Sequence, residues 1–228
     1  AKAIADRLVA HLLGLQPHQR ILQRDRKLND DEATAWQTAQ ARLMTGEPIQ
    51  YITGSETFRG LVFQVDKRVL IPRPETEELV QHALNWLRSQ HFDNSQVLEF
   101  GTGSGCISIS LAAELDSAQV LATDICEDAL VLARANLVQV AAQLEQPQLE
   151  RRVEFCTHDL FTTHPPAEGL FELILSNPPY IPAAGSNTLH TNVVRHEPHL
   201  ALFIDSQDLM APYRQLADFA KMLLAKAG

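Results

Sequence analysis

The sequence predicts an α/β fold in which a mostly parallel, doubly wound sheet follows a small helical domain and a β-hairpin. From residue 74 onward, apolar runs of strand length alternate with amphipathic helical segments, which is typical of a parallel sheet. A glycine-rich turn joins the first of these strands to its helix. The 228 residues, 45% of them hydrophobic, suffice for one large domain and a small appendage.

Residues 1–50 have the pattern of a helical domain. Gly14 can end a first helix, and Asn29 with Glu32 forms a possible capping box before a second one. The apolar face of the first helix would consist of Ile4, Leu8 and Leu12. This domain either only packs or also docks a substrate, and the residues leave both interpretations open.

Residues 51–72 change to a period of two, which predicts a β-hairpin that links the two domains. Leu61, Phe63 and Val65 alternate with polar neighbours, and Gly60 can supply the turn.

Residues 73–228 form the predicted α/β domain. Pro74 suits the first turn of a helix, where the glutamates that follow it are favourable. Strands are expected at 96–100, 119–123, 152–156 and 171–176, and later helices at 104–116, 127–143 and 207–226. A fifth strand should follow the last helix, so we expect this domain to be incomplete at its C-terminal end.

Composition limits the classes of function. The chain has 19 Lys and Arg against 28 Asp and Glu, a net charge of −9, which argues against a free-standing nucleic-acid binder. Its cysteines, Cys106, Cys126 and Cys156, are widely spaced, which predicts neither a disulfide framework nor a metal site and indicates a reducing cytoplasm. Without a run of about 18 apolar residues, no membrane helix is expected. We expect a monomer.

The stretch "EFGTGSG" (99–105) lies between the first strand and its helix. Gly101, Gly103 and Gly105 would let the backbone turn tightly and bring N–H groups close to a ligand at the carboxyl end of the sheet. No Lys-Ser/Thr follows, so the loop is not a P-loop. The alternative is a tight turn without a ligand.

Acidic residues follow the next two strands. Asp124 lies about 20 residues after the glycines, where a carboxylate can bind two ribose hydroxyls or cap the next helix. Asp159 could bind an adenine amino group while Leu160 packs against the ring, or Asp159 could be an ordinary polar loop residue. Together these positions predict a nucleoside-containing cofactor.

The fourth strand ends in "NPPY" (177–180). The Asn177 side-chain carbonyl and the main-chain carbonyl of Pro178 can accept both hydrogens of a planar –NH2 group, and Tyr180 can stack on its flat neighbour. The prolines stiffen the backbone, so these acceptors would be pre-positioned for methyl transfer to an sp2 nitrogen. The alternative is a turn in which proline only stops the strand.

"EFGTGSG", Asp124 and "NPPY" together resemble the class I methyltransferases that use S-adenosylmethionine and act on planar amino groups. Adenine-N6 methyltransferases of nucleic acids share this set. Two further segments, "GEPIQYITGSETFRGLVFQVDKRVLIPRPETEELV" (46–80) and "EPHLALF" (197–203), are similar to the protein-glutamine N5-methyltransferases of the HemK/PrmC type.

The resemblance implies a Rossmann-like methyltransferase domain preceded by a helical substrate-docking domain. It implies N5-methylation of the glutamine in the Gly-Gly-Gln motif of class 1 peptide-chain release factors, with S-adenosylmethionine converted to S-adenosylhomocysteine and no metal. Competing hypotheses are an adenine-N6 nucleic-acid methyltransferase, glutamine methylation of a ribosomal protein, a cofactor-binding module without catalysis and a nicotinamide dehydrogenase.

The resemblance also assigns roles to residues. Those assigned to the cofactor are Gly101, Thr102, Gly103, Ser104, Gly105, Asp124, Asp159, Leu160 and Asn177. Those assigned to the acceptor glutamine are Asn177, Pro178, Pro179, Tyr180, Arg73 and Glu75, of which Asn177, Pro178 and Tyr180 carry catalysis. Pro74 would help to shape the mouth of the site, and Glu197 would brace it.

Overall fold

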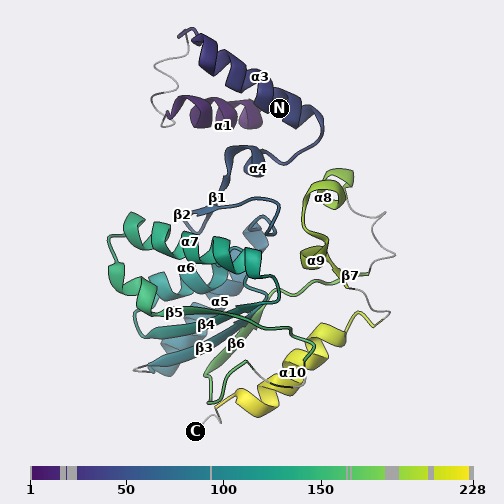
Figure 1. Ribbon diagram of the computed structural model, residues 1–228. Coiled ribbons are helices and arrows are strands. Elements are labelled where there is room, and N and C mark those ends of the chain that lie inside the picture. The colour runs from purple at the N-terminus through teal and green to yellow at the C-terminus, as the bar shows by residue number, and fades with distance from the viewer. Residues whose placement is uncertain are drawn as a thin grey trace. The chain divides into compact units, whose positions relative to one another are not determined.

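A computed structural model describes residues 2–15, 19, 25–92, 94–162, 164, 166–182, 190–204 and 208–225. The chain divides into two compact units, Ala1–Gly54 and Ser55–Gly228, here called the helical unit and the α/β unit (Figure 1).

The helical unit contains α1 (Lys2–Leu13), α3 (Asp30–Met44) and α4 (Ile49–Thr53). The predicted capping box is confirmed, because the Asn29 side chain accepts from the Glu32 N–H at 2.8 Å and the Glu32 carboxylate accepts from the Asn29 N–H at 2.9 Å. The small core of the unit consists of Leu8, Ala39 and Ile52, with Leu12, Trp36, Leu43 and Ile49 packed against it. Ile4, which was expected on the buried face, is exposed.

The hairpin begins later than the sequence predicted. Residues 51–54 belong to α4 and its C-cap, because Ile52 packs in the helical core and Gly54 ends the helix in the left-handed conformation. The strands are β1 (Ser55–Phe58) and β2 (Leu61–Gln64), paired antiparallel. Leu61 and Phe63 are buried while their neighbours in β2 are exposed, so the predicted alternation is confirmed.

The α/β unit is built on four parallel strands in the order β5-β4-β3-β6. Their bounds are Ser95–Phe100 for β3, Ala118–Asp124 for β4, Val153–Thr157 for β5 and Leu173–Ser176 for β6. All four predicted strands are present, and the parallel, doubly wound class is confirmed. The chain moves outward from β3 through β4 to β5 and then returns to the other side of β3, which creates a switch point between β3 and β6.

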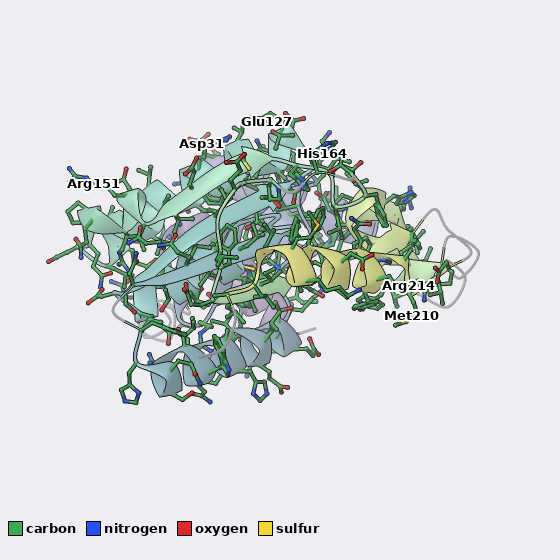
Figure 2. All side chains as sticks on the ribbon, turned by 90° about the horizontal axis from the view of Figure 1, so that it is seen from below. Asp31, Glu127, Arg151, His164, Met210 and Arg214 are labelled. Atoms are coloured by element: carbon green, nitrogen blue, oxygen red, sulfur yellow. The ribbon has the colours of Figure 1, made fainter. Side chains whose placement is uncertain are left out.

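Helices cover both faces of this sheet (Figure 1). On one face lie α5 (Pro74–Gln90), α6 (Cys106–Glu114) and α7 (Glu127–Gln143), and their apolar residues form the main core with Val97, Val120 and Phe155. On the other face lies α10 (Ala211–Leu223) (Figure 2). Its Phe219 and Leu223 pack against Leu98 and Phe100. Figure 2 labels Met210 and Arg214 at the start of α10.

The predicted bounds of three elements need correction. The helix expected at 104–116 is α6, Cys106–Glu114, because Gly105 is its N-cap and Leu115 its C-cap. β6 starts at Leu173 rather than 171, because Phe171 pairs with the chain after α10: its N–H donates to the Leu223 carbonyl at 2.8 Å and its carbonyl accepts from the Ala225 N–H at 2.9 Å. The Glu172 N–H donates to the Gln96 carbonyl of β3, so the backbone groups of Phe171 face the other side, away from β3. α10 begins at Ala211, with Pro212 in its first turn, whereas 207 and 226 lie outside the described residues.

The segment after β6 was expected to be a long loop, and it contains short elements. They are β7 (Ile181–Pro182), α8 (Thr191–His196), α9 (His199–Leu202) and β8 (Phe203–Ile204), with β7 paired to β8. A 3₁₀ helix (Pro147–Arg151) precedes β5. In the described part of the chain, every helix is too short or too polar to cross a membrane.

Side-chain amides of α7 complete the free edge of the hairpin. The Val62 N–H donates to Gln143 at 3.2 Å, and the Val62 carbonyl accepts from Gln139 at 2.7 Å. Both backbone groups of Gln64 bond the Asn136 side chain, its N–H at 2.7 Å and its carbonyl at 3.0 Å. Residues three and four positions apart share a helix face, so α7 can satisfy an edge that would otherwise need water or another strand.

Asn136 also reaches the glycine-rich turn. Its side-chain nitrogen donates to the Ser104 carbonyl at 2.9 Å, and the residue is 0% exposed. One buried carboxamide therefore joins three segments that are distant in sequence: β2, the glycine turn and α7.

We expect Asn136→Ala to lower the free energy of unfolding of the α/β unit by about 3 kcal/mol, because three backbone groups, one buried and two partly buried, lose their partner. Urea unfolding in a Trp36→Phe background measures this, since Trp86 on α5 is then the sole tryptophan fluorophore. The matched control is Gln139→Ala, whose bonds to the Val62 carbonyl and to the Gln64 side chain are both exposed, and which should cost about 1 kcal/mol or less. Equal losses in the two variants would contradict the anchoring role of Asn136.

Candidate active site

A cavity of about 760 Å³ opens at the carboxyl ends of the parallel strands, at the switch point between β3 and β6. Its size lies in the range of small-molecule sites. The predicted site residues that line it are Arg73, Gly101, Thr102, Gly103, Ser104, Asp124, Asp159, Leu160, Asn177, Pro178 and Pro179. Gly105, Glu75 and Tyr180 do not line it; Glu75 and Tyr180 are exposed, and the Tyr180 side chain is 60% accessible.

The glycine turn is shaped by backbone conformation and by helix packing. Gly105 is left-handed (φ 80°) and is the N-cap of α6. A Cβ there would come within 2.8 Å of Ile109 and 3.3 Å of Ala133, so glycine at this position allows α6 and α7 to approach. At Gly103 a Cβ would meet nothing within 4 Å, so the side of the turn that faces the cavity is open.

Asp124 holds the glycine turn. Its carboxylate accepts from the Gly103 N–H at 2.8 Å and from the Cys126 N–H at 2.9 Å. Burial raises the pKa of Asp124, and the backbone N–H groups of Cys126, Gly103 and Ile125 oppose that rise. The alternative that Asp124 caps α7 is wrong, because Cys126 is the N-cap residue and none of the side chains that the structure describes caps the N-terminus of this helix.

The adenine side of the predicted site is lined by residues from two strand ends. Asp159 accepts from the Phe161 N–H at 2.9 Å, which forms a tight turn after β5 and leaves its second carboxylate oxygen for a ligand. Leu160 lines the cavity and packs against the core beneath α10. Sequence reasoning missed Ile125, which lines the same cavity and is 47% exposed. The sequence feature that could have pointed to Ile125 is its position as an apolar residue immediately after Asp124, the acid at the end of the strand.

The Asn-Pro-Pro-Tyr segment leaves β6 beside the glycine turn. The Ser176 hydroxyl donates to the Phe100 carbonyl at 2.9 Å, which ties the end of β6 to the end of β3. Asn177 is half-buried, and its side-chain nitrogen donates to the Thr76 hydroxyl at 3.4 Å. Thr76 lines the cavity, and nothing in its local sequence pattern pointed to the site.

The mouth of the cavity is braced by an ion pair between the half-buried Arg73 and the buried Glu197. An Arg73 guanidinium nitrogen donates to Glu197 at 2.5 Å, and the other Glu197 oxygen accepts from the Ile71 N–H at 3.3 Å. The Glu197 side chain is 1% exposed, so this carboxylate depends on both partners. The arrangement agrees with the bracing role implied for Glu197, and it commits the Arg73 guanidinium to that contact.

Burial raises the pKa of two groups beneath the glycine turn, the Glu99 carboxyl and the Cys106 thiol. Burial raises the pKa of Glu99 to about 7, and the Thr102 hydroxyl donates to one of its oxygens at 2.8 Å. Burial also raises the pKa of the Cys106 thiol to about 12. Cys106 lines the cavity, and as a protonated thiol it is a poor nucleophile.

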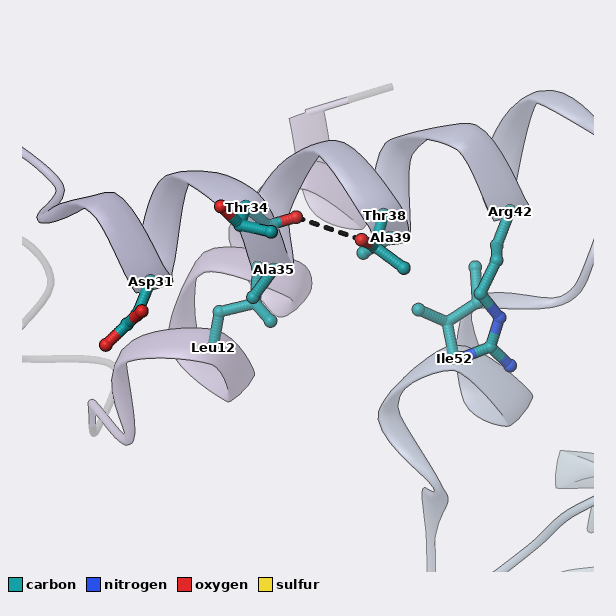
Figure 3. A pocket seen from close by; sticks show the side chains of 8 residues that line it. All are labelled: Leu12, Asp31, Thr34, Ala35, Thr38, Ala39, Arg42 and Ile52. Carbon is teal, nitrogen blue, oxygen red and sulfur yellow. Dashed lines mark hydrogen bonds between the residues drawn. The ribbon is translucent and has the colours of Figure 1, made fainter.

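The helical unit has a shallow depression of its own, of about 380 Å³ (Figure 3). Its lining consists of Leu12, Asp31, Thr34, Ala35, Thr38, Ala39, Arg42 and Ile52. The Thr38 hydroxyl donates to the Thr34 carbonyl at 3.0 Å, and Arg42 is bonded to Glu47 and to the Tyr51 carbonyl. Polar groups that satisfy one another do not form a convergent catalytic site. In the described residues, no cluster of three His, Cys, Asp or Glu side chains could hold a metal.

A parallel sheet with this strand order and a glycine turn at its switch point, together with a match to a methyltransferase family, identifies a class I S-adenosylmethionine-dependent methyltransferase domain. Residues 78–200 match the methyltransferase small domain family, and residues 1–54 match the PrmC N-terminal domain. The hMettl16 catalytic domain, solved in complex with MAT2A 3′UTR hairpin 6, shares the fold with a TM-score of 0.50 and 18% identity over 85% of this chain and 64% of that one.

Relatives from bacteria narrow the assignment. The release factor glutamine methyltransferase of Chlorobaculum tepidum is 40% identical over 98% of this chain and 75% of its own length. The enzyme of the same description from Flavobacterium psychrophilum is 38% identical over 91% of this chain and 70% of its own. The chain belongs to the release factor glutamine methyltransferase family.

The buried Glu99 carboxyl should make stability depend on pH. Between about pH 4.5 and 7 the folded protein keeps this proton while the unfolded chain has lost it, so raising the pH favours unfolding. Glu99→Gln cannot ionise and can still accept from Thr102. We therefore expect the free energy of unfolding of Glu99→Gln to rise relative to the parent, by at most about 1.4 kcal/mol per pH unit in this window, and to level off above pH 7.

Urea unfolding of both proteins at pH 5, 6, 7 and 8 measures this difference. Asp124 is present in both proteins, so its own titration largely cancels. A difference that stays constant from pH 5 to 8 would show that Glu99 does not titrate in this range.

Proposed function

We propose that this chain transfers a methyl group from S-adenosylmethionine to N5 of the glutamine in the Gly-Gly-Gln motif of class 1 peptide-chain release factors. The observation that carries the proposal is the position of Asn177 and Pro178. They line the same cavity as the glycine turn and Asp124, so an acceptor –NH2 held by the former would lie beside a cofactor held by the latter.

The cavity fits the cofactor. Gly101 and Gly103 offer open backbone on its floor, and Asp124 supplies a carboxylate that is already anchored by two N–H groups and can still accept from ribose hydroxyls. Ile125 and Leu160 provide apolar surface for an adenine ring, and Asp159 an acceptor for its amino group. When bound, S-adenosylmethionine supplies an electrophilic methyl group on a sulfonium sulfur and leaves as the thioether.

The acceptor side follows from hydrogen-bond chemistry. An amide –NH2 has two hydrogens, which the Asn177 side-chain carbonyl and the Pro178 main-chain carbonyl can accept. Held in this way, the nitrogen presents its face to the methyl group instead of rotating freely. The nitrogen gains a methyl group and releases one proton to water, and the two carbonyls stabilise the N–H groups as they become more acidic. Because the methyl donor is already cationic, no metal is required.

The acceptor is proposed to be a protein rather than a nucleic acid. The clamp accepts any planar –NH2, so adenine satisfies it as well as glutamine does. The net charge of −9 disfavours a polyphosphate partner, and the relatives act on release factors by their description. We assign the helical unit to docking of the substrate protein, supported by its match to the PrmC N-terminal domain. The free cysteines are consistent with the cytoplasm.

Replacing the clamp residue should abolish turnover while leaving the cofactor bound. We expect Asn177→Ala to lower kcat by about 100-fold or more, with only a modest change in cofactor affinity. The assay incubates the chain with a release factor and S-adenosylmethionine and follows a methyl-sized mass gain on the Gly-Gly-Gln peptide. The matched control is Asn85→Ala on the exposed face of α5. Methyl label that enters RNA or DNA, and not the release factor, would overturn the proposed acceptor.

The cofactor assignment has a separate test in calorimetry. We expect Asp124→Ala to weaken S-adenosylmethionine binding by about 10-fold or more, because it removes a charged acceptor and frees the Gly103 N–H. Asp116→Ala is the matched control, since the Asp116 side chain is almost fully exposed and lies outside the cavity. An unchanged dissociation constant in Asp124→Ala would contradict the proposal that the cofactor binds at this end of the sheet.

A further inference from the structure

Thr76 lies beside Asn177 in the wall of the cavity, although 101 residues separate them. Pro74 begins α5, and the Thr76 N–H donates to the Arg73 carbonyl at 3.0 Å, so the first turn of the helix fixes the position of Thr76. Thr76 is 9% exposed. In the described part of the chain, its hydroxyl is the hydrogen-bond partner found for the Asn177 side chain, at 3.4 Å.

The direction of this hydrogen bond matters because a carboxamide has two unlike ends. Its nitrogen donates and its oxygen accepts. Here the Asn177 nitrogen faces Thr76, which leaves the oxygen for a group in the cavity. A rotation by 180° would turn N–H groups toward the hydrogens of an incoming –NH2, and the clamp would repel the acceptor it has to hold.

We propose that Thr76 is a positioning residue that orients the Asn177 carboxamide, so that its carbonyl faces the acceptor nitrogen. This inference rests on the proposed function. It gives two residues of one helical turn separate tasks at the same cavity: Arg73 braces the mouth through Glu197, and Thr76 orients the clamp.

The kinetic test uses Thr76→Val, which keeps the shape of threonine and removes the hydroxyl. We expect kcat to fall about 10-fold, as for the loss of one hydrogen bond, with the dissociation constant of S-adenosylmethionine unchanged. Thr76→Ser should restore most of the activity. Thr76→Ala serves in place of the valine variant if urea unfolding shows that valine disturbs the fold.

A double-mutant cycle separates orientation from packing. In an Asn177→Asp background both side-chain oxygens accept, so there is no orientation for Thr76 to set. The cost of Thr76→Val should therefore be several-fold smaller in that background than in the parent. An equal cost in both backgrounds, no loss of kcat in the parent, or a loss that serine does not restore would each overturn the proposal.

A spectroscopic readout does not depend on activity. The side-chain amide signal of Asn177, assigned by its disappearance in Asn177→Asp, should shift in Thr76→Val and stay in place in Thr76→Ser. An unmoved signal in Thr76→Val overturns the inference even if the enzyme is active. Conversely, a parent chain that methylates no release factor but shows the shift would refute the proposed function and leave the contact between Thr76 and Asn177 standing.

Discussion

The buried carboxamide of Asn136 is the contact on which the arrangement of the α/β unit most depends. It bonds both backbone groups of Gln64 and the carbonyl of Ser104, so the hairpin and the glycine turn are held by the same side chain. A buried polar group whose hydrogen bonds are all made favours one arrangement of its neighbours, because any displacement leaves one of the groups unpaired. The chain that leaves this hairpin goes on to form one wall of the cavity, and the glycine turn forms its floor. The Asn136 side chain therefore fixes the position of that wall relative to the glycine turn.

Local patterns in the sequence predicted the parts of the fold that depend on local physics. Alternation predicted β2, apolar runs predicted the four parallel strands, and the Asn29 capping box was visible from its spacing. The glycine turn and Asp124 could be assigned to one rim because the carboxyl ends of parallel strands meet there. The start of the hairpin, predicted at residue 51, was placed too early because a glycine at the start of a hairpin and one that ends a helix look alike in sequence; Gly54 ends α4, and Ile52 packs in the helical core.

The contacts that the sequence could not reveal are those between distant segments. Asn136 and Gln64 are 72 residues apart, and Thr76 and Asn177 are 101 apart. In each case the residue looks like an ordinary member of a helix, and its role comes from the tertiary contact. Ile125 is different, because it follows Asp124 directly. The sequence had already placed Asp124 at the edge of the site, so Ile125 could have been assigned to the cavity from its position alone.

Several charged groups at the site are already engaged by the fold. Asp124 is held by two N–H groups, Arg73 is paired with Glu197, and Glu99 lies beneath the turn with its pKa raised by burial. A neutral amide acceptor gains little from a charge but much from correctly directed carbonyls, and a cavity of this kind supplies the latter. Tyr180, 60% exposed beside the clamp, lacks a covering group within the described chain. An acceptor delivered on the loop of a protein would bury that ring, whereas a free glutamine would leave most of it in water. Discrimination between acceptors would therefore arise at this rim, outside the clamp that performs the chemistry.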